Sequence, residues 1–183
     1  MVSQEVISFV TNTLSLLTLL STCYLIIFFF SLITKKKFQP LFINENILFF
    51  AFLVSLVATL GSLFFSEVAK YEPCKLCWFQ RIFMYPQVII LGIALWKKEF
   101  LVRKYAIPLS VIGALIAGFH YLLQIRVLNL NLPCSTIGQS VSCSTLFVMK
   151  FGYITIPMMA LISFLLIIIF LGFKEGKTYK GKI

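Results

Sequence analysis

Charged residues are scarce in this sequence of 183 residues: they make up 12% of it, and only six are acidic. Hydrophobic residues make up 60%. A typical soluble domain is about 25% charged, so this composition excludes one and indicates an integral membrane protein. The sequence also lacks a linker long enough to divide it, which predicts one structural domain.

The N-terminal region has no basic residue ahead of its first apolar run. The only charged residue there is Glu5, and Lys35, Lys36 and Lys37 follow the run. A secretory signal peptide has the opposite arrangement, with its basic segment in front. The first run is therefore expected to be a transmembrane helix that the protein keeps.

Apolar runs of roughly 20 residues are needed to cross a membrane. Five runs approach this length, at about 7–33, 47–65, 82–96, 105–125 and 154–173. The third run is short, but Trp78 and Phe79 just before it can extend the span. Short connections make successive spans antiparallel. The predicted fold is an all-α integral membrane protein: a four-helix transmembrane bundle with one additional N-terminal transmembrane helix outside it.

The net charge of +10 comes from sixteen lysines and arginines. When the spans alternate, most of these residues fall on one side of the membrane: Lys35, Lys36, Lys37, Lys97, Lys98, Arg103, Lys104, Lys174, Lys177, Lys180 and Lys182. Basic residues near helix ends mark the cytoplasmic side, so the excess is a topology signal and not a nucleic-acid surface. It places the N-terminus and both cysteine loops outside the cytoplasm and the C-terminus inside.

Four of the five cysteines form two pairs in these outer loops. The first is Cys74-x-x-Cys77, and the second is Cys134 with Cys143. Two such pairs permit a redox relay, two structural disulfides, or four ligands of a zinc ion. The fifth, Cys23, lies deep in the first span and is expected to be a buried thiol without a partner.

The surroundings of the first pair favour redox chemistry. The pair stands at the start of a span, where a helix N-terminus stabilises a thiolate. Arg81 follows Cys77 by four residues, so within a helix the two share a face, and a nearby cation stabilises a thiolate. Arg81 could instead be an anchor that reaches toward the lipid headgroups.

His120 is the only histidine, inside the fourth span. Ionisable groups in membrane spans often mark function. Gln124 lies one turn away on the same face. His120 could form an interhelical hydrogen bond, or it could join Arg81 in holding a ring that carries carbonyl groups.

Two blocks, Gly61–Glu67 and Cys74-Lys75-Leu76-Cys77-Trp78-Phe79-Gln80-Arg81, closely resemble the DsbB/BdbC family of membrane disulfide-forming oxidoreductases. The segments 120–124 and 151–157 are also similar to that family, and the match covers about residues 47–172. The resemblance divides the chain into an additional helix with a basic cytoplasmic loop (1–45) and a DsbB/BdbC-like four-helix domain with two extracytoplasmic cysteine loops (46–183). It assigns no function to residues 1–45.

The resemblance implies a protein-disulfide:quinone oxidoreductase in a bacterial cytoplasmic membrane. Its partner would be an extracytoplasmic thioredoxin-fold thiol oxidase, similar to DsbA or BdbD, that oxidises secreted proteins. Electrons would pass from this partner to Cys134 and Cys143, then to Cys74 and Cys77, and finally to a membrane quinone (menaquinone or ubiquinone). Arg81 and His120 would contact the quinone. No metal and no nucleic acid is expected.

Two other functions compete with this one. A vitamin K epoxide reductase-like enzyme also couples thiols to a quinone in a helix bundle, but its motif arrangement differs from the Gln80-Arg81 block. A non-catalytic membrane protein with structural disulfides or a zinc site is the second alternative. A carrier of electrons out of the cytoplasm is disfavoured, because all four paired cysteines lie in the outer loops.

Overall fold

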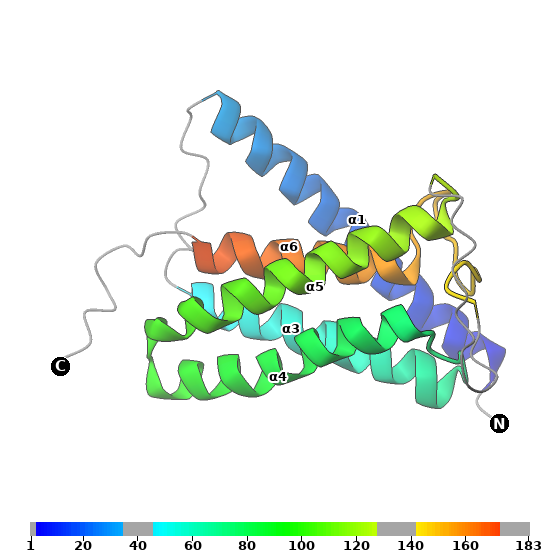
Figure 1. The fold of residues 1–183 in the computed structure, drawn as a ribbon, viewed down its shortest axis with the longest axis horizontal. Coiled ribbons are helices and arrows are strands. Elements are labelled where there is room, and N and C mark those ends of the chain that lie inside the picture. Colours follow the sequence, from blue (N-terminus) through cyan, green and yellow to red (C-terminus); the bar gives the residue numbers. More distant parts are fainter. Residues whose placement is uncertain (1–2, 35–45, 128–141, 173–183) are drawn as a thin grey trace.

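The computed structural model describes residues 3–34, 46–127 and 142–172, and it is helical nearly throughout (Figure 1). The helices, with the π-helical turn η1 and the 3-10 turn η2, are α1 (Gln4–Ile33), α3 (Ile47–Leu63), η1 (Phe64–Val68), α4 (Lys75–Lys97), η2 (Phe100–Val102), α5 (Arg103–Gln124) and α6 (Ile156–Gly172). Four stretches are long and apolar enough to cross a membrane, and α6 is a shorter apolar helix. The predicted all-α membrane fold with five apolar helices is confirmed.

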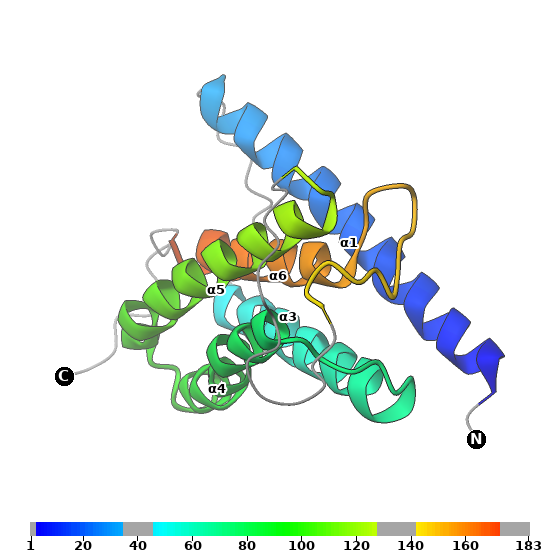
Figure 2. The ribbon, with the colours of Figure 1, turned by 45° about the vertical axis from the view of Figure 1, so that its right-hand side comes forward.

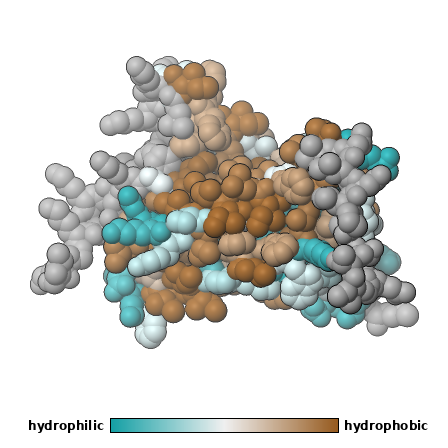
Figure 3. Space-filling model, viewed as in Figure 1, coloured by the Kyte–Doolittle hydropathy of each residue, from teal (hydrophilic) through white to brown (hydrophobic). Residues whose placement is uncertain are grey.

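Helices α3, α4, α5 and α6 form the four-helix bundle, each packed against its neighbours in chain order, with α6 closing the ring on α3. Helix α1 runs obliquely across the outside and packs on α6 (Figures 1 and 2). On the face in Figure 3, hydrophobic side chains form a band across the middle, with hydrophilic ones toward both ends. This is the surface that a bilayer requires.

The cysteine end of the bundle is the end where α3 and α5 finish and α4 and α6 begin. Helix α4 starts at Lys75, so Trp78 and Phe79 do extend this span beyond the predicted 82–96. At the same end a tight turn leads into α6, in which Lys150 and Ile154 exchange two backbone hydrogen bonds of 2.9 Å. Gly152 has a φ of 78° there, a conformation that favours glycine.

The expectation of a buried Cys23 is wrong, because the side chain is exposed on α1. The same face carries other exposed apolar residues, among them Ile26 at 63% and Ile27 at 50%. Since lipid surrounds this helix, an exposed thiol meets hydrocarbon and not water. Hydropathy therefore does not reveal which side of such a helix faces the protein.

The ring of Phe164 on α6 packs directly against Gly113 on α5. A Cβ atom at this position would overlap the ring of Phe164, which is fully buried and cannot move aside. A small residue here leaves room for a large ring from the neighbouring helix.

We expect Gly113→Ala to destabilise the bundle by about 1–3 kcal/mol through overpacking. The matched control is Gly118→Ala on the same helix, where the nearest atom to a new Cβ is Leu161 Cδ1 at 4.0 Å, an ordinary contact. The measurement is the midpoint of thermal unfolding in detergent, followed by the loss of monomer in size-exclusion chromatography. Equal midpoints for the two variants would contradict the close approach.

Candidate functional site

The first cysteine pair lies at the N-terminus of α4. Cys74 precedes the helix with an extended backbone (φ −70°, ψ 172°), and its carbonyl accepts the helical hydrogen bond from Trp78 N at 3.1 Å. Cys77 lies in the first turn of the helix, where backbone N–H groups and the helix dipole favour a negative charge. The sequence prediction that this pair stands at a helix start agrees with the structure.

The two sulfur atoms of the pair are 3.6 Å apart, which is a thiol hydrogen bond and not a disulfide bond. Cys74 is buried, with 4% of its surface exposed, whereas Cys77 is partly exposed. The hydrogen bond to Cys77, followed by burial, raises the pKa of Cys74 to about 12. In the reduced pair Cys74 is therefore the protonated thiol over the whole physiological pH range.

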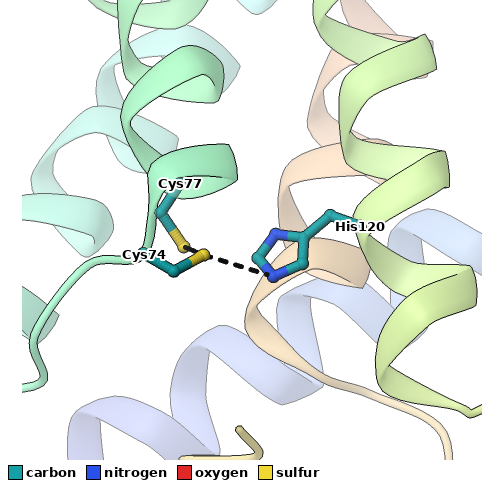
Figure 4. A group of neighbouring side chains, drawn as sticks. All are labelled: Cys74, Cys77 and His120. Atoms are coloured by element: carbon teal, nitrogen blue, oxygen red, sulfur yellow. Dashed lines mark hydrogen bonds between the residues drawn. The ribbon is translucent and has the colours of Figure 1, made fainter. Parts of the chain in front are cut away.

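His120 reaches from α5 to this pair (Figure 4). Its Nε2 lies 3.6 Å from Cys74 Sγ and 3.1 Å from the carbonyl oxygen of Cys143. Its Nδ1 lies 2.9 Å from Nε2 of Gln80 on α4. A carbonyl only accepts, so Nε2 carries the hydrogen, and Nδ1 accepts one from the Gln80 amide. These partners fix the tautomer and orientation of the imidazole, which is 1% exposed.

Only one member of the second cysteine pair can be placed. Cys134 lies outside the described residues, while Cys143 is buried at the cysteine end with 4% exposure. Besides the contact of its carbonyl with His120, its segment is held by Gln124, which donates to the Thr145 carbonyl at 3.0 Å. Two polar residues one turn apart on α5 thus hold the Cys143 segment beside the first pair.

Arg81 turns toward α3. Its Nε donates to Ser62 Oγ at 3.1 Å and its Nη2 to the Ser62 carbonyl at 3.2 Å, while the guanidinium lies 5.2 Å from the Trp78 ring centroid. Tyr85 donates to the same Ser62 hydroxyl at 3.2 Å. A side chain held by two hydrogen bonds to a neighbouring helix is fixed in place, unlike an anchor that reaches for the headgroups.

A cavity of about 280 Å³ opens beside Cys77 and Arg81. Its walls come from α1, α3, α4 and α6, and it extends from this polar end to the apolar side chains of Leu53 and Leu166. Within the described part of the chain, the residues that line it do not include His120. The structure therefore brings Cys77 and Arg81 into one cavity and places His120 on the Cys74 side of the pair.

Stacked aromatic rings cover the cavity at the cysteine end. Phe65 of η1 stacks on Tyr71 with centroids 6.0 Å apart, and Tyr71 stacks on Phe147 at 5.0 Å. All three rings line the cavity. They join η1, the segment before α4 and the segment after Cys143, so this stack ties both cysteine-bearing segments to the bundle.

Cys74, Cys77 and His120 could also hold a metal ion, since their three ligand atoms lie within 4.8 Å of one another. Two thiolates and one imidazole suit Zn²⁺. This group differs from the four-cysteine site that the sequence suggested. It exists only while the pair is reduced, because a disulfide withdraws both sulfur ligands.

Two residues of the site, Gln80 and Ser62, had no role assigned from the sequence. Gln80 was part of the recognised block but received no role, although its position three residues after Cys77 places it on a neighbouring face of the helix. Ser62, the partner of Arg81, lies in the Gly61–Glu67 block that resembles the family, but one serine in an apolar span does not by itself indicate a partner for Arg81.

Comparisons with known proteins agree with this geometry. The family model described as disulfide bond formation protein DsbB matches residues 44–173. Disulfide bond formation protein C of Bacillus subtilis (strain 168) is 48% identical over 132 residues, 71% of this chain and 93% of the relative. Probable disulfide formation protein C 1 of Bacillus anthracis is 47% identical over 124 residues, 68% and 88% of the two chains. No solved structure matches.

The two thiols of the reduced pair should differ in reactivity. With iodoacetamide at pH 8, we expect Cys77 to be alkylated well before Cys74, because Cys74 is buried and its pKa is raised to about 12. Trypsin cuts after Lys75 and so puts the two cysteines on separate peptides, whose alkylation mass spectrometry can follow over time. The Cys74 rate should still be rising with pH above 9. Faster alkylation of Cys74 would contradict the assignment.

Proposed function

The chain belongs to the DsbB family of disulfide bond formation proteins, and on this premise we propose that it oxidises an extracytoplasmic dithiol partner and passes the electrons to a membrane quinone. The observation that carries the proposal is the shared cavity of Cys77 and Arg81. One redox sulfur and one fixed cation meet there at the polar end of an otherwise apolar space.

The cavity suits the chemistry of a quinone. Menaquinone and ubiquinone both have a flat ring with carbonyl oxygens and a long apolar tail, and a bound quinone accepts two electrons and two protons. Two N–H groups of Arg81 already donate to Ser62, and its remaining N–H groups are available to a ring carbonyl. The apolar end, toward Leu53 and Leu166, would take the first part of the tail.

The cysteines would carry the electron pair in three transfers: from the partner to the loop pair, from the loop pair to Cys74 and Cys77, and from these to the quinone. A thiolate of the partner attacks the Cys134–Cys143 disulfide and forms a mixed disulfide with Cys134, which the partner's second thiolate resolves to leave the loop reduced. The Cys143 thiolate then attacks Cys74, breaks the Cys74–Cys77 bond and releases Cys77 as a thiolate. Cys134 resolves the Cys74–Cys143 bond, which leaves Cys74 and Cys77 reduced. Their reoxidation releases the two electrons and two protons that a quinone takes up.

For His120 we propose a role at the sulfur atoms. Contact of His120 with the quinone stays a prediction, because the imidazole faces Cys74 and, among the described residues, does not line the cavity. Its Nε2–H can donate to Cys74 when that sulfur carries negative charge during exchange. The same N–H contacts the Cys143 carbonyl, so His120 would also align the two cysteines that react with each other.

The distribution of basic residues predicts which side of the membrane the cysteine end faces. The eleven basic residues on the side opposite the cysteine loops indicate that the cysteine end faces outward and the C-terminus lies in the cytoplasm. The partner is then a thioredoxin-fold thiol oxidase on the outer surface of a bacterial cytoplasmic membrane.

A metal-binding function is the second candidate, supported by the spacing of Cys74, Cys77 and His120. Metal analysis of the purified reduced protein distinguishes the two. One zinc per chain together with no quinone reduction would favour a zinc site. A vitamin K epoxide reductase-like activity would appear as reduction of a quinone epoxide at the expense of the dithiol.

The two ends of the relay should fail differently. With a reduced thioredoxin-fold oxidase as substrate, the wild type should reduce quinone, and Cys77→Ala and Cys134→Ala should abolish the reaction. With a partner variant that lacks its resolving cysteine, Cys77→Ala should still form the mixed disulfide through Cys134, whereas Cys134→Ala should not. Because the partner cannot cross a membrane, sealed protoplasts should oxidise it from outside. Equal trapping by both variants would contradict the order of the relay, and oxidation only after lysis would reverse the sidedness.

Arg81→Lys should weaken quinone binding. Lysine keeps the charge but loses the planar set of N–H donors. The loss of one charge-assisted hydrogen bond, about 1.5–3 kcal/mol, should raise the half-saturating quinone concentration by about tenfold or more. The matched control is Arg103→Lys, whose guanidinium lies over the Phe100 ring at the other end of the bundle. An unchanged half-saturation point would leave Arg81 with a purely structural role.

A further inference from the structure

Helix α1 lies outside the part of the chain that the family model covers, which begins at residue 44. In the match to the B. subtilis relative, 132 aligned residues make up 93% of that protein. The remainder is far shorter than the roughly 20 residues that a span needs. The relative therefore has no counterpart of α1, and this helix distinguishes the present chain.

One face of α1 lines the cavity beside Cys77. Its residues are Leu14, Leu17, Thr18 and Ser21, spaced three or four apart as on a single helical face. The other walls come from the bundle, so α1 supplies the side that faces away from it. Without α1 this side of the cavity would open to lipid.

Close packing holds this face in position. Leu14 sits over Gly61 of α3, where an added Cβ would lie 3.1 Å from Leu14 Cδ1. Gly61 immediately precedes Ser62, the partner of Arg81. The contact therefore places α1 next to the polar end of the cavity.

The polar residues on the inner side of α1 form their hydrogen bonds within α1 and need no partner from the bundle. Thr11, Ser15 and Thr18 are 5%, 0% and 7% exposed, and each hydroxyl donates to the carbonyl four residues earlier in its own helix, at 2.7, 2.7 and 2.8 Å. Small side chains with internally satisfied hydroxyls let helices pack closely without hydrogen bonds between them. A ligand in the cavity would therefore meet this surface through shape complementarity and not through hydrogen bonds.

We propose that the α1 face of Leu14, Leu17, Thr18 and Ser21 is a specificity-determining wall of the quinone cavity, which encloses the ring and the first part of the tail on the lipid side. The proposal rests on the proposed function, because it concerns the same ligand. A quinone is dissolved in the bilayer, so it must reach Cys77 from the side, and α1 stands on that side. Its contacts would then set which quinones fit and how tightly.

The test compares the two faces of α1 in the full-length protein. Leu14→Ala shortens a side chain of the cavity wall, and Thr18→Leu enlarges one. The controls Leu16→Ala and Leu20→Ala alter the lipid-facing side, where these residues are 51% and 59% exposed. We expect the two wall variants to change the half-saturating quinone concentration at least threefold and the two controls to leave it unchanged. Trapping of the partner through Cys134 should be normal in all four. A purely structural role of this face would instead lower the thermal unfolding midpoint of the wall variants and leave their half-saturating quinone concentration unchanged.

A photoreactive quinone gives a second measurement that does not depend on turnover. Trypsin releases α1 within the peptide of residues 1–35, which is separate from the peptides of α3 and α4. We expect this peptide to be labelled, and labelling to fall when unmodified quinone competes. If the wild type reduces quinone but only other peptides are labelled and the wall variants match the controls, the wall proposal is wrong and the proposed function stands. Absence of quinone reduction and of all labelling would overturn both.

Discussion

The buried hydrogen bonds between α4 and α5 fix how these two helices face each other. In hydrocarbon a polar side chain must find its partner within the protein. Gln80 meets His120 at the cysteine end, and two turns deeper Gln87 accepts a hydrogen bond from Ser110 at 2.9 Å. Rotation or sliding of α4 against α5 would break both pairs in an environment without water. The positions of the two cysteines relative to α5 follow from this constraint.

With α4 held in this way, the cysteines at its N-terminus have different surroundings. Cys74 is buried against His120 and the Cys143 segment, while Cys77 lines the cavity together with Arg81. A Cys-x-x-Cys pair at a helix start allows this, because its first member lies before the helix and its second lies in the first turn. Exchange with another cysteine and transfer to a lipid-soluble acceptor can thus occur on opposite sides of one pair.

The cavity depends on parts of the chain that are distant from one another. Ser62 of α3 holds Arg81, the rings of Phe65, Tyr71 and Phe147 cover the cysteine end, and α1 adds a wall from outside the family domain. Each of these parts belongs to a different helix or connecting segment, and none of them forms the cavity alone. Their assembly gives the cavity a polar end and an apolar end, which is what a ring with a hydrocarbon tail requires.

The sequence by itself determined the features that depend on local physics. The length of the apolar runs gave five membrane helices in alternating directions, and helical periodicity placed Arg81 one turn from Cys77. It could not place His120, because its partners Gln80 and Cys74 are 40 and 46 residues away. Tertiary structure alone decided that contact, the bond from Arg81 to Ser62, and which face of α1 meets the cavity. Lipid and protein interior are equally apolar, so hydropathy does not tell one side of a membrane helix from the other; the exposed Cys23 shows this. Only the packing of the helices and the pairing of their few polar groups select the rotation.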